Sequence, residues 1–366
     1  MSENLIYGAD ILTYGAVNDG KTDCTDAFEK AIANGESLIS VPFGKYLITR
    51  PLELSSNTKL HIHPSSCIYY APKDKNQKNF IFSKDAHSLE ICGGVFNIAE
   101  KVKCKVFSFN DCQNIRISSC LINTPDAVSC ASFDSCTDIC ISDVRFNGIC
   151  ESVVLVGECE SISVKNCKVI SSVNFLQFGT GTKECDIEKI NVRNIEVQFC
   201  DAFSEFLKGK AENVIFEDIN ATFAFAFAKL FDKFNLEDAT FENIDICMLD
   251  RGLNEGKTKT YFSFACAPDG FEIRNLKRNT DNESIPFVPT FIMKNTNTDK
   301  AKMIIDGIAL DNVISARGKS KTVSMTTAKL TNPCNKFIYT LEIGVDKDDT
   351  FTLPLGDFDY MRIDRA

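Results

Sequence analysis

An alternating pattern of apolar and polar residues recurs six times along the middle of the chain. Each repeat begins at an apolar anchor, has a second apolar residue two positions later, a small polar residue at the fourth position, and apolar residues again at the fifth and seventh. Alternation with period two predicts a strand, and its interruption by a polar residue predicts a sharp corner. The anchors, which are 24, 23, 28, 24 and 25 residues apart, are Ile115, Ile139, Ile162, Ile190, Val214 and Ala239.

The corner positions indicate how the repeats are stacked. Asn and Asp tolerate the left-handed backbone that such a corner needs, and a fixed period in the twenties is typical of one structural unit stacked on itself. The sequence therefore predicts an all-β fold, a single-stranded right-handed parallel β-helix with one coil per repeat and a rise of about 4.8 Å per coil. The corner residues are Ser119, Asp143, Asn166, Asn194, Asp218 and Asn243.

The rest of the chain is interpreted as the ends of the same single domain, residues 1–366. Residues 1–50 form an N-terminal cap with a short helix that begins near Asp23 and is closed by Gly35. Coils occupy residues 51–312, less regularly between 60 and 106, with loops expected at 249–261 and 277–300. Residues 313–366 are expected to form capping strands.

Two segments near the N-terminus carry a family resemblance. Residues 14–28 read YGAVNDGKTDCTDAF, and residues 41–48 read VPFGKYLI. Together with the coils, these segments resemble the pectate-lyase-like β-helix superfamily, which includes polysaccharide lyases, glycoside hydrolases, fructotransferases, epimerases and phage tailspikes. The resemblance implies the fold for most of the chain and says little about the chemistry.

Within that superfamily the chain is most similar to the polygalacturonase-type hydrolases of family 28. Their first motif, Asn-Thr-Asp, resembles residues 123–126, which end in Asp126 and contain an inserted proline. Where the family has Gly-Asp-Asp, only Glu151 offers a carboxylate. Asn174 falls where the family has Gly-His-Gly, and Lys208 retains the lysine of Arg-Ile-Lys. The resemblance implies a scaffold shared with these hydrolases and a catalytic signature from which this chain departs.

The residues themselves indicate a similar chemistry. The loops between coils should stack into one lateral surface, and glycoside hydrolysis needs two carboxyls, about 5 Å apart for retention or about 6.5–9.5 Å apart for inversion. Lysines on the same surface would bind a carboxylate or a sugar hydroxyl, or pair with Glu205. The alternative interpretation is that these acidic residues have no catalytic role and lie by chance on the solvated flank of the β-helix. The candidate catalytic residues are Asp126, Glu151 and Glu205, and the candidate substrate-binding residues are Asn174, Asp201, Lys208 and Lys229.

Three classes of function follow from these residues. The first is a glycoside hydrolase acting on uronate-containing or other plant-type oligosaccharides, with an oligosaccharide or polysaccharide as its partner and no cofactor or metal. The second is a fructotransferase-like or lyase-like enzyme on the same scaffold. The third is a non-catalytic glycan-binding or structural β-helix. Homo-oligomerisation is left open.

Composition narrows the partners and the compartment. The net charge of −10 argues against nucleic acid and against an anionic membrane surface, and the absence of Trp excludes a Trp platform for sugars. No stretch has the length and apolarity of a membrane span, and no signal peptide is visible at the start, so a cytoplasmic location is expected. The 17 cysteines are interpreted mainly as small apolar residues of the interior, kept reduced.

Four sets of side chains receive a more specific prediction. Cys120 and Cys167 should replace Val or Ile in the core, and Cys112, Cys136 and Cys159 should form an inward column. Phe223, Phe225 and Phe227 should stack inward. The alternation around His61 and His63 turns both rings outward, where surface exposure is a more common role than metal binding.

Overall fold

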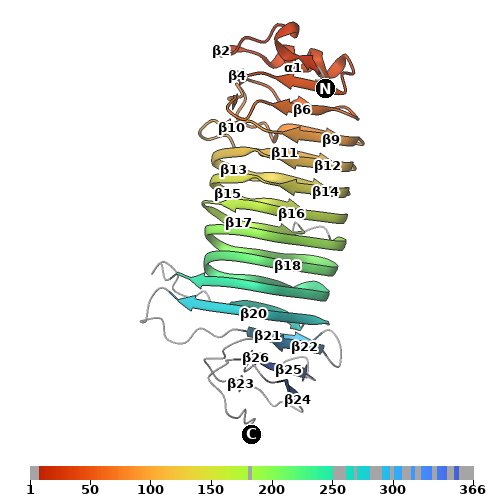
Figure 1. The fold of residues 1–366 in the computed structure, drawn as a ribbon, viewed down its shortest axis with the longest axis vertical. Coiled ribbons are helices and arrows are strands. Elements are labelled where there is room, and N and C mark those ends of the chain that lie inside the picture. The colour runs from red at the N-terminus through yellow and green to blue at the C-terminus, as the bar shows by residue number, and fades with distance from the viewer. Residues whose placement is uncertain are drawn as a thin grey trace, which may run out of the picture. The chain divides into compact units, whose positions relative to one another are not determined.

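The computed structural model describes residues 8–179, 184–249, 261–267, 270–280, 291–296, 301–306, 315–317, 323–331, 336–343 and 350–353. The chain divides into two compact units, unit 1 (Met1–Val173) and unit 2 (Asn174–Ala366). Both units contain parallel strands stacked as a β-solenoid, which confirms the predicted fold class (Figure 1). The single domain over residues 1–366 remains a prediction.

Unit 1 has three rows of parallel strands, and each strand pairs with its counterpart in the next coil. The first row contains β3 (Leu38–Val41), β6 (Lys59–Ile62), β9 (His87–Cys92), β12 (Gln113–Ser118), β14 (Thr137–Ser142) and β16 (Cys159–Val169). The second contains β4 (Lys45–Ile48), β7 (Cys67–Tyr70), β10 (Val95–Ile98) and the first parts of β13 (Leu121–Asp134) and β15 (Arg145–Val156). The third contains β5 (Leu52–Glu53), β8 (Asn79–Lys84), β11 (Lys105–Asn110) and the remainder of β13 and β15.

The strand register agrees with the predicted repeat. Ile115 pairs with Ile139, and Ile139 pairs with Ile162. The coils before Val106 are in the same register, because Ile39 pairs with Leu60 and Leu60 with Ile91. Their spacings, 21 and 31 residues, hide the period in the sequence.

The six predicted corners are confirmed by their backbone conformation. A positive φ is uncommon for a residue other than glycine, and Asn and Asp adopt it most readily. The φ angles are 56° at Ser119, 57° at Asp143, 54° at Asn166, 50° at Asn194, 55° at Asp218 and 56° at Asn243.

The corner side chains also bond from coil to coil. Asn243 Nδ2 donates to Asp218 Oδ1 at 2.9 Å, and Asn275 Nδ2 donates to Asn243 Oδ1 at 3.0 Å. We expect Asn243→Ala to lower the free energy of unfolding by about 1–2 kcal/mol, because alanine disfavours positive φ and makes neither bond. Asn243→Gly, which tolerates that φ, should cost less in the same urea titration. Equal costs would contradict the backbone explanation.

The N-terminal end of unit 1 carries the only helix longer than one turn among the described residues. Helix α1 (Thr25–Ala33) buries Phe28 against Tyr46, with ring centroids 6.2 Å apart. The chain leaves the helix through Gly35 at φ 73°, as predicted. The 3-10 helix η1 (Ile11–Tyr14) and the strands β1 (Ala9–Asp10) and β2 (Asp19–Asp23) complete this end. Among the described residues, no helix is long and apolar enough to cross a membrane.

Strand β17 (Ser172–Phe178) begins at the end of unit 1 and continues into unit 2. Strand β18 (Cys185–Met248) follows it and continues without interruption through several coils of unit 2. The predicted loop at 249–261 lies mainly outside the described residues. The loop predicted at 277–300 is partly wrong, since β20 (Phe271–Thr280) and β21 (Phe291–Thr296) extend into it. Strands are confirmed in the tail, where the pairing becomes antiparallel. The other strands are β19 (Phe262–Ala267), β22 (Ala301–Asp306), β23 (Ser315–Arg317), β24 (Val323–Thr331), β25 (Lys336–Ile343) and β26 (Thr350–Leu353).

The cysteine prediction is confirmed for the residues on which it was based. They are free thiols and at most 3% exposed. A hydrogen bond with Cys136 holds the pKa of Cys112 at about 7, and the same bond, together with burial, raises the pKa of Cys136. Burial raises the pKa of Cys120 and Cys167, which keeps both thiols protonated and unreactive at neutral pH.

The phenylalanine stripe is only partly interior. Phe223 and Phe227 are fully buried, as predicted, whereas Phe225 is half-buried. The strict alternation ends here, because Ala224 and Ala226 are buried as well. Phe225 therefore does not share the fully buried position of its two neighbours, which corrects the prediction for Phe225.

Candidate functional site

The predicted site residues in unit 1 lie on neighbouring strands of the outer surface. Asp126 occupies an irregularity of β13, where the register with β15 shifts between Thr124 and Ala127. Its carboxylate lies 3.6 Å from Lys103 Nζ. Glu151 is exposed on β15, next to Cys150, which pairs with Ala127. Nothing in this geometry assigns a catalytic role to either carboxylate, and both assignments stay predictions.

A more organised group of polar side chains lies in unit 2, and we call Asn174, Glu205, Lys229 and Phe231 the Glu205 cluster. Asn174 Nδ2 donates a hydrogen bond to Glu205 Oε2 at 3.0 Å. Lys229 Nζ donates to the other oxygen, Oε1, at 3.4 Å. The ammonium also lies 4.3 Å from the centroid of the Phe231 ring. The structure thus brings together three of the seven residues that the sequence nominated.

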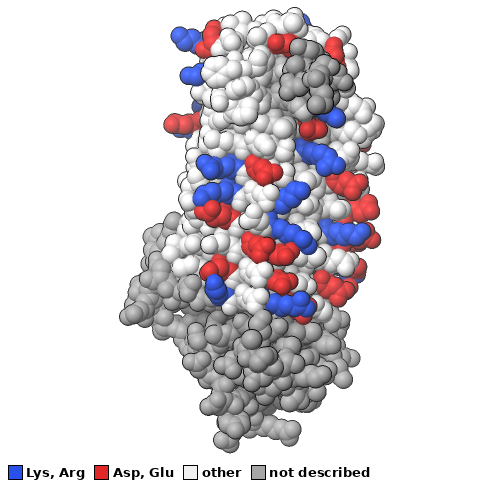
Figure 2. All heavy atoms as spheres, in the orientation of Figure 1, with Lys and Arg blue, Asp and Glu red and all other residues white. Residues whose placement is uncertain are grey.

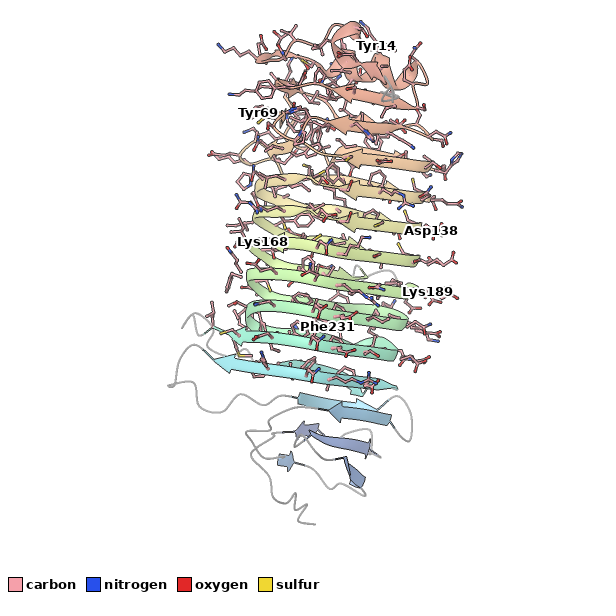
Figure 3. All side chains as sticks on the ribbon, viewed as in Figure 1. Tyr14, Tyr69, Asp138, Lys168, Lys189 and Phe231 are labelled. Carbon is pink, nitrogen blue, oxygen red and sulfur yellow. The ribbon has the colours of Figure 1, made fainter. Side chains whose placement is uncertain are left out.

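Adjacent coils of the solenoid position these side chains. Glu205, Lys229 and Phe231 all belong to β18, and Asn174 belongs to β17. Glu205 and Lys229 are 24 residues apart, which is one repeat of the sequence pattern. Lys229 pairs in register with Ser263 of β19, so the cluster lies on strands that are hydrogen-bonded on a continuous sheet. Figure 3 shows Phe231 on β18.

Burial makes this carboxylate unlike the typical surface acid. The side chain of Glu205 is only 18% exposed, and that of Lys229 is 39% exposed. Asn174 is 8% exposed and directs its amide at the carboxylate. A charge that is largely removed from water must be paired and hydrogen-bonded to be stable, and both oxygens of Glu205 satisfy that requirement. The cluster therefore holds the partly buried Glu205 carboxylate in a fixed position.

The other two candidates in unit 2 are Lys208 and Asp201. Lys208 pairs with Glu184 at 3.2 Å, so of the two lysines suggested as partners of Glu205 only Lys229 fills that role. Asp201 is half-buried on β18, four residues before Glu205.

Sequence reasoning missed Phe231. The signal was present, because Lys229 and Phe231 are two residues apart in a strand and therefore project from the same face. The prediction that His61 lies at the surface is confirmed, since its Nε2 is 3.0 Å from Glu90 Oε1 and its side chain is 46% exposed. No group of three His, Cys, Asp or Glu residues within the described part of the chain is arranged to hold a metal ion.

A family model described as "Rhamnogalacturonase A/epimerase, pectate lyase-like" matches residues 9–229, more than half of the chain. The chain belongs to this pectate lyase-like family. The match begins in the N-terminal cap and ends at Lys229, so it includes all seven candidate site residues of this pectate lyase-like chain. Membership confirms the resemblance that residues 14–28 and 41–48 indicated.

Two solved structures and one phage protein are similar to this chain or to part of it. A family 28 exopolygalacturonase from Yersinia enterocolitica superposes with a TM-score of 0.54 at 11% identity, over 80% of this chain and 78% of that one. A hyperthermoactive exopolygalacturonase from Thermotoga maritima gives a TM-score of 0.49 at 15% identity, over 82% and 92%. At 11% identity, the likeness to the Yersinia structure shows a shared fold alone. The pre-neck appendage protein of Bacillus phage B103 is 50% identical over 52 residues, which are 14% of this chain and 6% of the phage protein.

Proposed function

We propose that this pectate lyase-like chain binds an oligosaccharide at the Glu205 cluster, with Glu205 as the acid–base residue of a glycoside hydrolase. The observation that carries the proposal is the carboxylate held between Asn174 and Lys229 beside an aromatic ring. Sugar hydroxyls donate to carboxylates and accept from amides and ammonium groups. Aromatic rings offer apolar area to the C–H faces of sugars.

Hydrolysis also needs a second carboxyl group. Asp201 is the candidate that shares β18 and unit 2 with Glu205. In this proposal Glu205 transfers the proton at the glycosidic oxygen or at the attacking water, and Asp201 supplies the second function. Asn174 and Lys229 fix the orientation of the Glu205 carboxylate, so that its geometry is set before the sugar binds.

Binding without cleavage is the second candidate function. Both oxygens of Glu205 already accept a hydrogen bond, and one of the donors is a cation. A carboxylate held in this way suits the recognition of hydroxyl groups. The match to a phage appendage protein is compatible with such a role, although it covers a short segment.

The experiment is a binding and cleavage screen with a panel of oligosaccharides, using calorimetry, reducing-sugar release and mass spectrometry. We expect Glu205→Gln to weaken binding about tenfold or more, because a hydrogen bond to a charged group contributes about 1.5–3 kcal/mol. Glu217→Gln is the matched control, since Glu217 is a partly buried carboxylate paired with Arg193 at 3.0 Å outside the cluster. It should leave binding unchanged.

The products distinguish the remaining possibilities. Hydrolysis adds one water to the cleaved glycan, whereas an eliminase or an anhydro-forming transferase gives a product lighter by one water. Binding without products supports the second candidate. If no oligosaccharide binds, or if Glu217→Gln is as damaging as Glu205→Gln, the proposed function is wrong.

A further inference from the structure

Three lysines of β18 are already paired with carboxylates. Lys229 pairs with Glu205 itself at 3.4 Å. Lys208, three residues after Glu205 in the same strand, pairs with Glu184 at 3.2 Å. Lys210, two residues further on, contacts two carboxylates, those of Glu212 and Glu237. The charge of Lys229 in the cluster is therefore neutralised by Glu205, and the group of Lys210, Glu212 and Glu237 carries a net negative charge.

From this arrangement we infer the chemical class of the glycan: it is a neutral oligosaccharide, and a polyuronate is discriminated against. The inference rests on the proposed function, because it concerns the ligand of the same cluster. The sequence does not distinguish uronate-containing from other plant-type oligosaccharides, and this inference chooses between them.

A uronate carboxylate would need a cation that is not already committed. To bind Lys229 it would have to lie close to the Glu205 carboxylate, and like charges in a partly buried site repel strongly. Displacing Glu205 from Lys229 would leave a carboxylate that is 18% exposed without its cation, which is unfavourable.

The overall charge of the chain does not compensate for this repulsion. The chain carries a net charge of −10, so a polyanion is repelled as it approaches. Figure 2 shows basic and acidic side chains interspersed over the described part of the face in view. A binding surface for a polyanion would instead carry mainly positively charged side chains along the path of the ligand.

A neutral sugar uses the same groups without that penalty. The Lys229 ammonium has three N–H donors, of which one is directed at Glu205, so donors remain for a hydroxyl. The Glu205 carboxylate has more lone pairs than its two present donors use, so it can also accept from a hydroxyl.

The test uses matched pairs of tetrasaccharides in the gluco, galacto and manno series, one member with C6 hydroxymethyl groups and the other with C6 carboxylates. We expect the neutral member of the bound series to bind at least fivefold more tightly, which corresponds to about 1 kcal/mol. Its Kd should change less than about twofold between low and high salt, since no charge is neutralised on binding. Tighter, salt-sensitive binding of the uronate would overturn the inference and leave the proposed function intact. If neither member binds in any series, both are overturned.

A charge variant tests the cause of the discrimination. Glu205→Gln removes the carboxylate that neutralises Lys229, so uronate affinity should rise at least about threefold in low salt while neutral-sugar affinity falls. The control Glu217→Gln changes the total charge by the same amount and frees Arg193 instead. It should alter neither affinity. An equal rise in uronate affinity in both variants would show that total charge, and not the Lys229–Glu205 pair, is responsible, and would overturn the inference.

Discussion

Replacing Gly148 with alanine is expected to destabilise unit 1 by about 4 kcal/mol or more, among the largest costs that single substitutions produce. Gly148 has φ 131°, a region that residues with a side chain rarely adopt. A Cβ atom there would lie 1.8 Å from the carbonyl oxygen of Thr124 in the preceding coil. Since that oxygen belongs to the backbone of a paired strand, the coil spacing itself would have to open.

The measurement is chemical denaturation followed by far-UV circular dichroism, with Gly35→Ala as the matched control. Gly35 also has a positive φ, 73°, but a Cβ atom there meets nothing within 4 Å. The control should therefore show only the backbone cost of about 1–2 kcal/mol. If both variants lose the same stability, the close contact between coils at Gly148 is not present in solution.

The second large effect is expected for Phe227→Ala, at about 3–5 kcal/mol. The Phe227 ring is fully buried and lies between coils, with its centroid 4.6 Å from that of Phe203 and 5.6 Å from that of Phe262. Truncation leaves a cavity that a stack of hydrogen-bonded coils cannot close, because the strand spacing is fixed by the backbone ladder.

Phe225→Ala is the comparison for this prediction. It removes the same side chain two residues away in β18, from a half-buried position. We expect about half the cost or less, since part of that ring is already in contact with water. Thermal or urea unfolding of the two variants in parallel gives the answer. A larger loss for Phe225→Ala would mean that Phe225, and not Phe227, is the more deeply buried ring in solution.

The solenoid and its corners could be predicted because they depend on local, repeated features. Each corner from Ser119 to Asn243 needs a residue that adopts positive φ, and each coil must direct apolar side chains inward. The same sequence pattern therefore recurs in every repeat. The predicted coils between Ile39 and Ile117 lack a regular period, since the paired positions there are 21, 31 and 26 residues apart. Loops of different length between coils conceal a period that strand pairing preserves.

The sequence alone determined the stacked fold, the interior cysteines and the list of polar residues on the outer surface. Only the tertiary structure decided which of them meet. Asn174 and Glu205 are 31 residues apart and lie 3.0 Å from each other, while Lys208, three residues from Glu205, pairs with Glu184 instead. Side-chain pairing across coils depends on register and on the length of the intervening turn, and neither is encoded in the residues that form the pair.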